Sequence, residues 1–114
     1  MAGEPRKLAV QIKRDFFFVA PGDIVFVTRK QRKTLIVTAQ GFTYAIADSL
    51  ERLEGRLNGE GFFRCHKGYL VNAAMVKAFS PWGKKTFLVR FANTEETALA
   101  TLDKAKEFRE KYGI

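Results

Sequence analysis

Many short β-type runs, separated by turn signals, constrain the fold of this 114-residue chain most strongly. Residues 8–13 alternate apolar and polar side chains with a period of two, which is typical of a half-buried strand. Gly and Pro punctuate the runs that follow, for example at Pro21-Gly22 and Gln40-Gly41. The predicted strands are 8–13, 23–29, 35–39, 42–47, 62–65, 77–79, 87–91 and 97–100. Because the gaps between them are short, neighbouring strands are expected to pair antiparallel.

Two segments carry helical spacing instead, near residues 49–58 and 103–112. In the first, leucines recur at positions 50, 53 and 57, after a capping-box-like start from Asp48 to Glu51. In the second, Asp103 is interpreted as a residue of the first turn, which leaves Leu102 free to pack inward. The sequence therefore predicts an all-β fold, mainly antiparallel, with two short helices.

The chain is expected to form one domain over residues 1–114, with residues 1–7 as a flexible N-terminal segment. Its longest apolar cluster, residues 16–20, is far shorter than a membrane helix needs, and no signal-peptide core is readable. The single cysteine, Cys65, cannot form an intrachain disulfide. We therefore expect a cytoplasmic protein that does not act on membranes and uses no metal or cofactor. The aromatic triplet Phe16-Phe17-Phe18 is predicted to be core, divided between two buried faces.

Catalysis is disfavoured by the residues available. The one histidine, His66, is adjacent to Cys65, and neighbours in a strand point to opposite faces. This geometry argues against a nucleophile–base pair, so we expect no enzyme. Cys65 is predicted to be buried, with His66 on the other side, facing solvent or a ligand.

Positive charge is concentrated in two blocks. The formal net charge is +8; residues 1–33 contribute +5, and residues 62–91 contribute +6 with no acid at all. A field of this kind attracts polyanions, so DNA or RNA is the leading partner and an anionic membrane surface comes second. The alternative interpretation is ordinary solubility charge.

The sharpest electrostatic feature is the predicted hairpin connection at residues 29–34. Four cations should project together there, namely Arg29, Lys30, Arg32 and Lys33. A second basic turn is predicted at Lys84 and Lys85. Within residues 62–72, Arg64, His66 and Lys67 are expected to face outward. Lys67-Gly68-Tyr69 also begins like an RNA-recognition motif, which Leu70 breaks.

Three ordered stretches resemble the LytTR DNA-binding domain, the effector module of many bacterial response regulators. The first stretch consists of residues 23–27, the basic turn and residues 35–37; the second is residues 49–53, and the third is residues 63–72. Together with Thr101, the three stretches span roughly residues 8–112. The resemblance implies three small, mostly antiparallel sheets. It also implies that loops, rather than a recognition helix, enter successive major grooves of double-stranded DNA.

Carried over to this sequence, the first reading loop is 29–34, with Lys33 nearest the base-contacting position. The second is His66-Lys67. The third follows Thr101, where the family usually has arginine and this chain has Leu102-Asp103, with Lys104 the nearest base. Lys84 and Lys85 are candidate phosphate anchors.

The resemblance further implies transcription regulation through tandem half-sites, with a homodimer on DNA as a related expectation. The receiver or sensor domain that usually precedes such a module is absent from this chain. Two alternatives stay open. One is an RNA or single-strand binder that uses Lys67, Tyr69 and exposed phenylalanines, and the other is a protein-interaction domain for an acidic partner.

Overall fold

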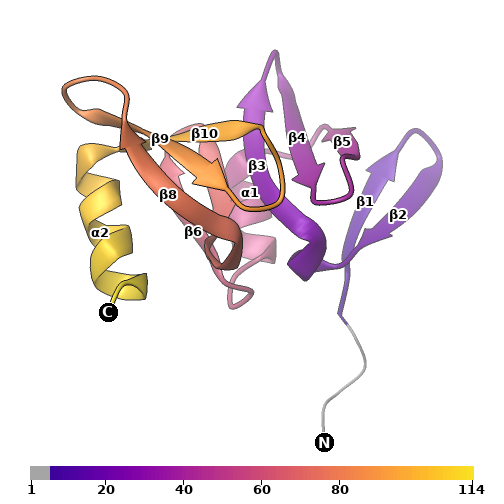
Figure 1. Cartoon of the computed structure of the whole chain (residues 1–114). Helices are drawn as coiled ribbons and strands as arrows, with labels where there is room; N and C mark the ends of the chain where they lie inside the picture. Colours follow the sequence, from indigo (N-terminus) through magenta and orange to yellow (C-terminus); the bar gives the residue numbers. More distant parts are fainter. Residues whose placement is uncertain (1–5) are drawn as a thin grey trace, which may run out of the picture.

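The computed structural model describes residues 6–114 and contains three antiparallel sheets, two α-helices and two short 3-10 helices (Figure 1). In chain order the elements are β1 (Leu8–Ile12), β2 (Asp15–Val19), η1 (Pro21–Asp23), β3 (Ile24–Lys30), β4 (Lys33–Thr38), β5 (Thr43–Ile46), α1 (Leu50–Arg56), β6 (Phe62–His66), β7 (Tyr69–Asn72), η2 (Ala73–Met75), β8 (Val76–Pro81), β9 (Thr86–Phe91), β10 (Thr97–Thr101) and α2 (Leu102–Tyr112). The predicted antiparallel, mainly β fold with two helices is confirmed. The sequence analysis missed the separate strands β2 and β7.

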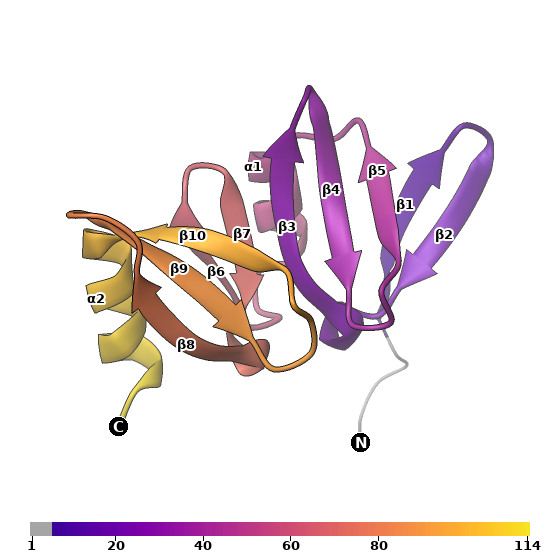
Figure 2. The ribbon, with the colours of Figure 1, turned by 45° about the horizontal axis from the view of Figure 1, so that its top comes forward.

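The sheets differ in size and position. The largest has five strands in the order β5-β4-β3-β7-β6, a second has the order β10-β9-β8, and β1 and β2 form a two-stranded hairpin. Figure 2 shows the five-stranded sheet between the other two. Because β3 pairs with both β4 and β7, it brings the residue 24–38 hairpin beside residues more than forty positions further along the chain.

Two buried clusters cover opposite faces of the five-stranded sheet. The first contains Val27 and Ile36 together with Leu50, Leu53 and Leu57, which confirms the predicted inward stripe of α1. The second joins the sheet to β9, β10 and α2; it contains Phe26, Val71, Val89, Phe91 and Ala98, among others. A fully buried leucine or phenylalanine contributes about 1.5–3 kcal/mol. Strand β3 is buried on both faces, which explains its unbroken apolar run.

The N-cap of α1 lies one residue after the start of the predicted capping box. Ser49, rather than Asp48, caps α1, and its Oγ accepts a hydrogen bond from the Arg52 amide at 3.1 Å. The Asp48 carboxylate pairs with Arg56 instead. Thr101 caps α2 by accepting from the Lys104 amide at 3.1 Å. Asp103 lies in the first turn of α2, as expected.

The core assignment of the phenylalanine triplet is wrong for two of its three members. Phe16 and Phe18 are 61% and 64% exposed, whereas Phe17 turns inward and contacts the Tyr44 ring at 5.5 Å. The reason is that β1 and β2 form a two-stranded ribbon that packs only one face against the first cluster. The other face has no second layer among the described residues.

Among residues 6–114, no helix is long and apolar enough to cross a membrane. A flexible segment is expected at residues 1–7. Residues 1–5 of this segment lie outside the described part of the chain.

Candidate nucleic-acid interface

Four hairpin turns that carry cations lie along one edge of the molecule. Figure 2 shows the β1–β2, β3–β4, β6–β7 and β8–β9 turns on the side away from both chain ends, with the start of α2 beside the last of them. Figure 1 shows the β1–β2, β3–β4 and β8–β9 turns on this same side. We call this row of turns the basic edge. Its exposed cations are Lys13, Arg14, Lys30, Arg32, Lys33, Lys67, Lys84 and Lys85. Sequence reasoning missed Lys13 and Arg14, whose signal was a basic pair directly after an alternating strand.

The β3–β4 hairpin ends in a two-residue turn. Gln31 and Arg32 have φ of 52° and 67°, and left-handed backbone at both central residues suits the twist of a tight hairpin. Lys30 and Lys33 are directly paired across the two strands and are both exposed. Like charges in this position repel each other. A bound polyanion would relieve that repulsion, so the turn is electrostatically suited to phosphate or to base acceptors.

Arg29 differs from the other three cations of this hairpin. Its Nη1 donates to Thr34 Oγ1 at 3.0 Å and to the Asp48 carbonyl oxygen at 3.1 Å. The Thr34 hydroxyl is buried and donates to the same carbonyl. Arg29 is exposed, as expected, but its guanidinium is engaged in these hydrogen bonds. This guanidinium ties the hairpin to the segment that precedes α1.

The carbonyl oxygen of Gly68 joins the β6–β7 turn to β3. It accepts a hydrogen bond from Thr28 Oγ1 at 2.8 Å and another from the Arg29 amide at 3.3 Å. The two loops predicted to read DNA, 29–34 and 66–67, are consequently neighbours, although they are more than thirty residues apart in sequence.

Arg64 holds the β6–β7 turn in place. Its guanidinium donates to the carbonyl oxygens of His66 and Lys67, and it also forms ion pairs with Glu54 at 2.8 Å and Glu51 at 3.3 Å. The side chain is only 18% exposed, so the expectation that Arg64 faces outward is wrong. The pKa of the Glu51 carboxyl is lowered, mainly by a hydrogen bond from the backbone amide of Glu51 and then by the hydrogen bond and positive charge of Arg64. Arg64 thus links the β6–β7 turn to the carboxylates of α1.

His66 is held as a neutral hydrogen-bond donor. Its Nδ1 accepts from the Gly68 amide at 3.0 Å, which leaves the proton of the neutral ring on Nε2. Burial, and then the charges of Lys67 and Arg64, lower the pKa of His66 below its usual 6.5. At neutral pH the ring can therefore offer one N–H to an acceptor, beside the exposed ammonium of Lys67.

A β-bulge changes the predicted geometry of Cys65 and His66. The register shifts between Arg64 and His66, so His66 pairs with Tyr69 and contacts its ring at 5.6 Å. Tyr69 packs against the second cluster, of which Cys65 is a member, so the two neighbours lie on the same side. The expectation of opposite faces is wrong, although Cys65 is buried as predicted. Burial raises the pKa of the Cys65 thiol to about 12, which makes it unreactive.

The β8–β9 turn lies beside the start of α2. The Leu102 amide donates to the Lys85 carbonyl oxygen at 3.0 Å, and Lys84 and Lys85 are exposed. Leu102 is half-buried. Lys104 forms an ion pair with Glu107 at 3.1 Å, which reduces its availability for another anion.

The remaining chemistry of the described chain is sparse. Within residues 6–114, no three histidine, cysteine, aspartate or glutamate side chains are grouped so that they could hold a metal ion. Sequence reasoning also gave no role to Trp82, which lies in the β8–β9 turn and is one of the most exposed large apolar side chains.

Comparisons with known proteins match nearly the whole chain. A family model described as the LytTr DNA-binding domain matches residues 14–113. The transcriptional regulatory protein NatR of Bacillus subtilis is 29% identical over 108 residues, which cover 93% of this chain and 45% of NatR. The sensory transduction protein LytT of Enterococcus faecalis is 27% identical over 112 residues, which cover 96% of this chain and 46% of LytT.

A solved structure agrees with this assignment. It is the LytTr DNA-binding domain of a response regulator from Bacillus cereus, with a TM-score of 0.78 and 25% identity, and the match covers 98% of this chain and 100% of that one. The chain spans less than half the length of the curated relatives it matches. With the three sheets, the two helices and a family match over residues 14–113 taken together, the chain belongs to the LytTr DNA-binding domain family.

Proposed function

We propose that this chain binds double-stranded DNA sequence-specifically through the basic edge and serves transcription regulation. Membership in the LytTr DNA-binding domain family supports DNA binding, and relatives such as NatR are named as transcriptional regulatory proteins. One observation carries the proposal. Four cationic turns from separate hairpins lie along a single edge, so one long polyanion can contact all of them (Figure 2).

Two neighbouring turns are the proposed base readers. The major groove is about 12 Å wide and admits a two-stranded β-ribbon, such as the tip of the β3–β4 hairpin. Lys30, Arg32 and Lys33 would donate there to guanine O6 and N7. His66 Nε2–H and Lys67 would serve the adjacent groove, with Arg64 fixing their turn. Lys84, Lys85 and Lys104 would neutralise phosphates, and Lys104 less so because Glu107 shares its charge.

Single-strand or RNA binding is a weaker candidate. Such binders stack bases on aromatic rings that stand open on a sheet. Here Tyr69 is half-buried and contacts both Phe26 and His66, so it is not an open ring. The exposed rings of Phe16 and Phe18 lie on β2, in another sheet than Lys67 and Tyr69. Competition among duplex DNA, single strands and RNA at fixed salt distinguishes these ligands. An excess of an acidic protein that displaces duplex equally well would favour the interaction-domain alternative.

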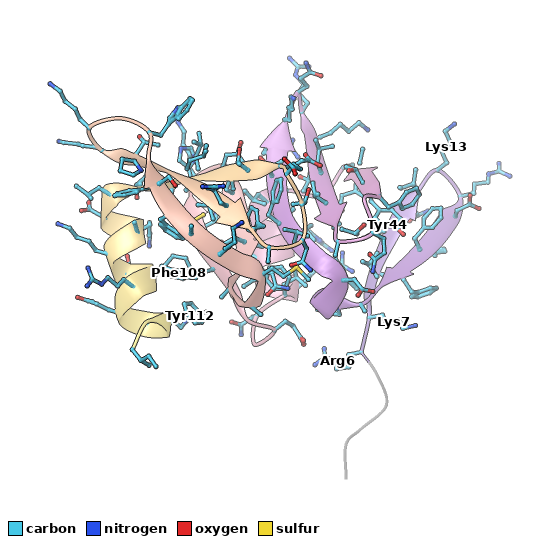
Figure 3. The ribbon with its side chains drawn as sticks, in the orientation of Figure 1. Arg6, Lys7, Lys13, Tyr44, Phe108 and Tyr112 are labelled. Carbon is cyan, nitrogen blue, oxygen red and sulfur yellow. The ribbon has the colours of Figure 1, made fainter. Side chains whose placement is uncertain are left out.

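The decisive experiment begins with selection of bound sites from a random duplex pool. On the selected duplex, Lys33→Ala should cost about 1–3 kcal/mol of binding free energy, with a smaller loss on a scrambled duplex. Lys7→Ala is the matched control, because it removes the same charge from the opposite edge (Figure 3). Equal losses on both duplexes would make Lys33 a phosphate contact. No selected site and no duplex binding would overturn the proposed function.

We further propose that residues 1–114 act as one binding domain and that two copies occupy tandem half-sites. The signal-receiving part would then lie in a separate segment, as the greater length of the relatives suggests. Sedimentation of the protein with single and tandem sites tests this. A fixed one-to-one complex on a tandem site would contradict it.

A further inference from the structure

The only tryptophan of the chain stands exposed in the β8–β9 turn. Trp82 is 67% exposed, and single exposed apolar residues are common on protein surfaces. What distinguishes Trp82 is its setting, because the exposed Lys84 and Lys85 follow in the same turn, separated from it only by Gly83. The exposed aromatic residue Phe42 has no such setting, since it lies in the β4–β5 turn between the neutral Gly41 and Thr43.

The backbone of this turn is held on both sides. The Trp82 amide donates to the Thr86 carbonyl oxygen at 3.0 Å, and the Lys85 carbonyl oxygen accepts from the Leu102 amide at 3.0 Å. The indole and the two ammonium groups are thus carried on a fixed support beside the start of α2. A fixed support lowers the entropy that these groups lose when they bind a ligand.

We propose that the β8–β9 turn is a further DNA contact in which the Trp82 indole packs on the deoxyribose–phosphate wall of a groove. This inference rests on the proposed duplex binding. An indole has a flat apolar face that fits a sugar and one N–H that fits a phosphate or base acceptor. Lys84 and Lys85 neutralise the flanking phosphates. The turn shares the basic edge with the base-reading turns, so a duplex that lies along this edge reaches the β8–β9 turn (Figure 2).

An exposed tryptophan with two lysines would also suit an anionic bilayer surface. The position of the turn on the basic edge favours DNA, because the neighbouring turns carry cationic hydrogen-bond donors. Insertion into a bilayer would instead call for further exposed apolar side chains beside Trp82. Within the described residues, the other strongly exposed phenylalanines, Phe16, Phe18 and Phe42, belong to β2 and the β4–β5 turn, away from this turn. The bilayer is therefore an outcome of the test.

The chain itself provides the probe, since all tryptophan emission comes from Trp82. We expect the selected duplex to quench or shift this emission, with saturation at the concentration found independently by the anisotropy of labelled DNA. Trp82→Ala should weaken duplex binding roughly tenfold, and Trp82→Phe much less, because the flat ring is kept. Phe42→Ala, the matched loss of an exposed ring on the opposite side, should leave affinity unchanged.

The outcomes separate this inference from the proposed function. If the duplex binds while the emission stays constant and Trp82→Ala binds normally, Trp82 is outside the interface and DNA binding stands. If labelled duplex does not bind at all, the proposed function fails first. If anionic phospholipid vesicles shift the emission and duplex does not, the turn contacts membranes instead. Melting curves that match wild type would show that the exposed-ring variants remain folded.

Discussion

Arg64 shows that a cation in a predicted reading loop can serve the protein instead of the ligand. Its guanidinium satisfies two turn carbonyls and two carboxylates at once, and such charge-assisted bonds are stronger than neutral ones. The sequence could not reveal this role, because Glu51 and Glu54 come from a helix that precedes the strand. The hydrogen bonds of Arg29 could not be predicted from the sequence either. Its partner is a backbone carbonyl, which no side-chain pattern marks.

His66 should make stability depend on pH. Its pKa in the folded chain lies below the usual 6.5, so the unfolded chain takes up the proton first as the pH falls. Stability is then complete above about pH 6.5 and declines as the pH falls through the folded pKa. Denaturant unfolding at about pH 7.5 and 5.5 measures this decline, which His66→Gln should reduce. An equal decline in both proteins would assign the effect to groups other than His66.

At the scale of single elements, capping is the part of the prediction that the structure corrected most directly. Acidic and hydroxyl residues both start helices well, so the pair Asp48-Ser49 left two candidates, and the cap role of Thr101 was not predicted. The backbone conformation determines which residue is the N-cap, and in the structure Ser49 caps α1 and Thr101 caps α2. The β6 bulge was equally invisible, because an inserted residue leaves no periodic signal.

The cap assignment of α2 leads to a graded prediction. Thr101→Ala removes the hydroxyl that accepts from the Lys104 amide and should cost about 0.5–2 kcal/mol of unfolding free energy. Asp103→Ala removes only a favourable charge in the first turn and should cost about 0.3–1 kcal/mol. It should leave duplex affinity equal or slightly higher. Thermal melts rank the two variants, and a larger loss for Asp103→Ala would reverse the assignment.

The β1–β2 hairpin gives an element-scale prediction with an internal control. Lys13 has φ of 58°, an uncommon conformation for a lysine, and with Arg14 it ends the hairpin on the basic edge (Figure 3). The double variant Lys13→Ala/Arg14→Ala should weaken binding to a long duplex through loss of phosphate contacts. Arg6→Ala/Lys7→Ala removes the same two charges from the base of the hairpin and should bind normally. Equal losses would mean that net charge alone matters.

At the scale of the whole molecule, cations from two charge blocks that are distant in sequence meet along one edge, although Arg6 and Lys7 of the first block lie on the opposite edge (Figure 3). The two blocks could be identified from the sequence, and the strongest indication was that residues 62–91 contain six basic residues and no acidic one. Their convergence could not be identified in this way, because it depends on β3 pairing with β7 and placing Thr28 opposite Tyr69. Local alternation predicts which segments are strands. It does not predict which distant strand becomes the neighbour.

This convergence determines how binding should respond to salt. The longest dimension of the described chain is 44 Å, which corresponds to about 13 base pairs at about 3.4 Å per step. If the edge neutralises about five to seven phosphates, the slope of log K against log salt should be roughly −4 to −6. Lys84→Ala/Lys85→Ala should make that slope shallower by about 2, while Arg6→Ala/Lys7→Ala leaves it unchanged. A duplex of about 8 base pairs is shorter than the edge, so it cannot contact all the turns and should also give a shallower slope. A slope that is the same for both duplex lengths would mean that one turn, rather than the whole edge, carries the electrostatic contact.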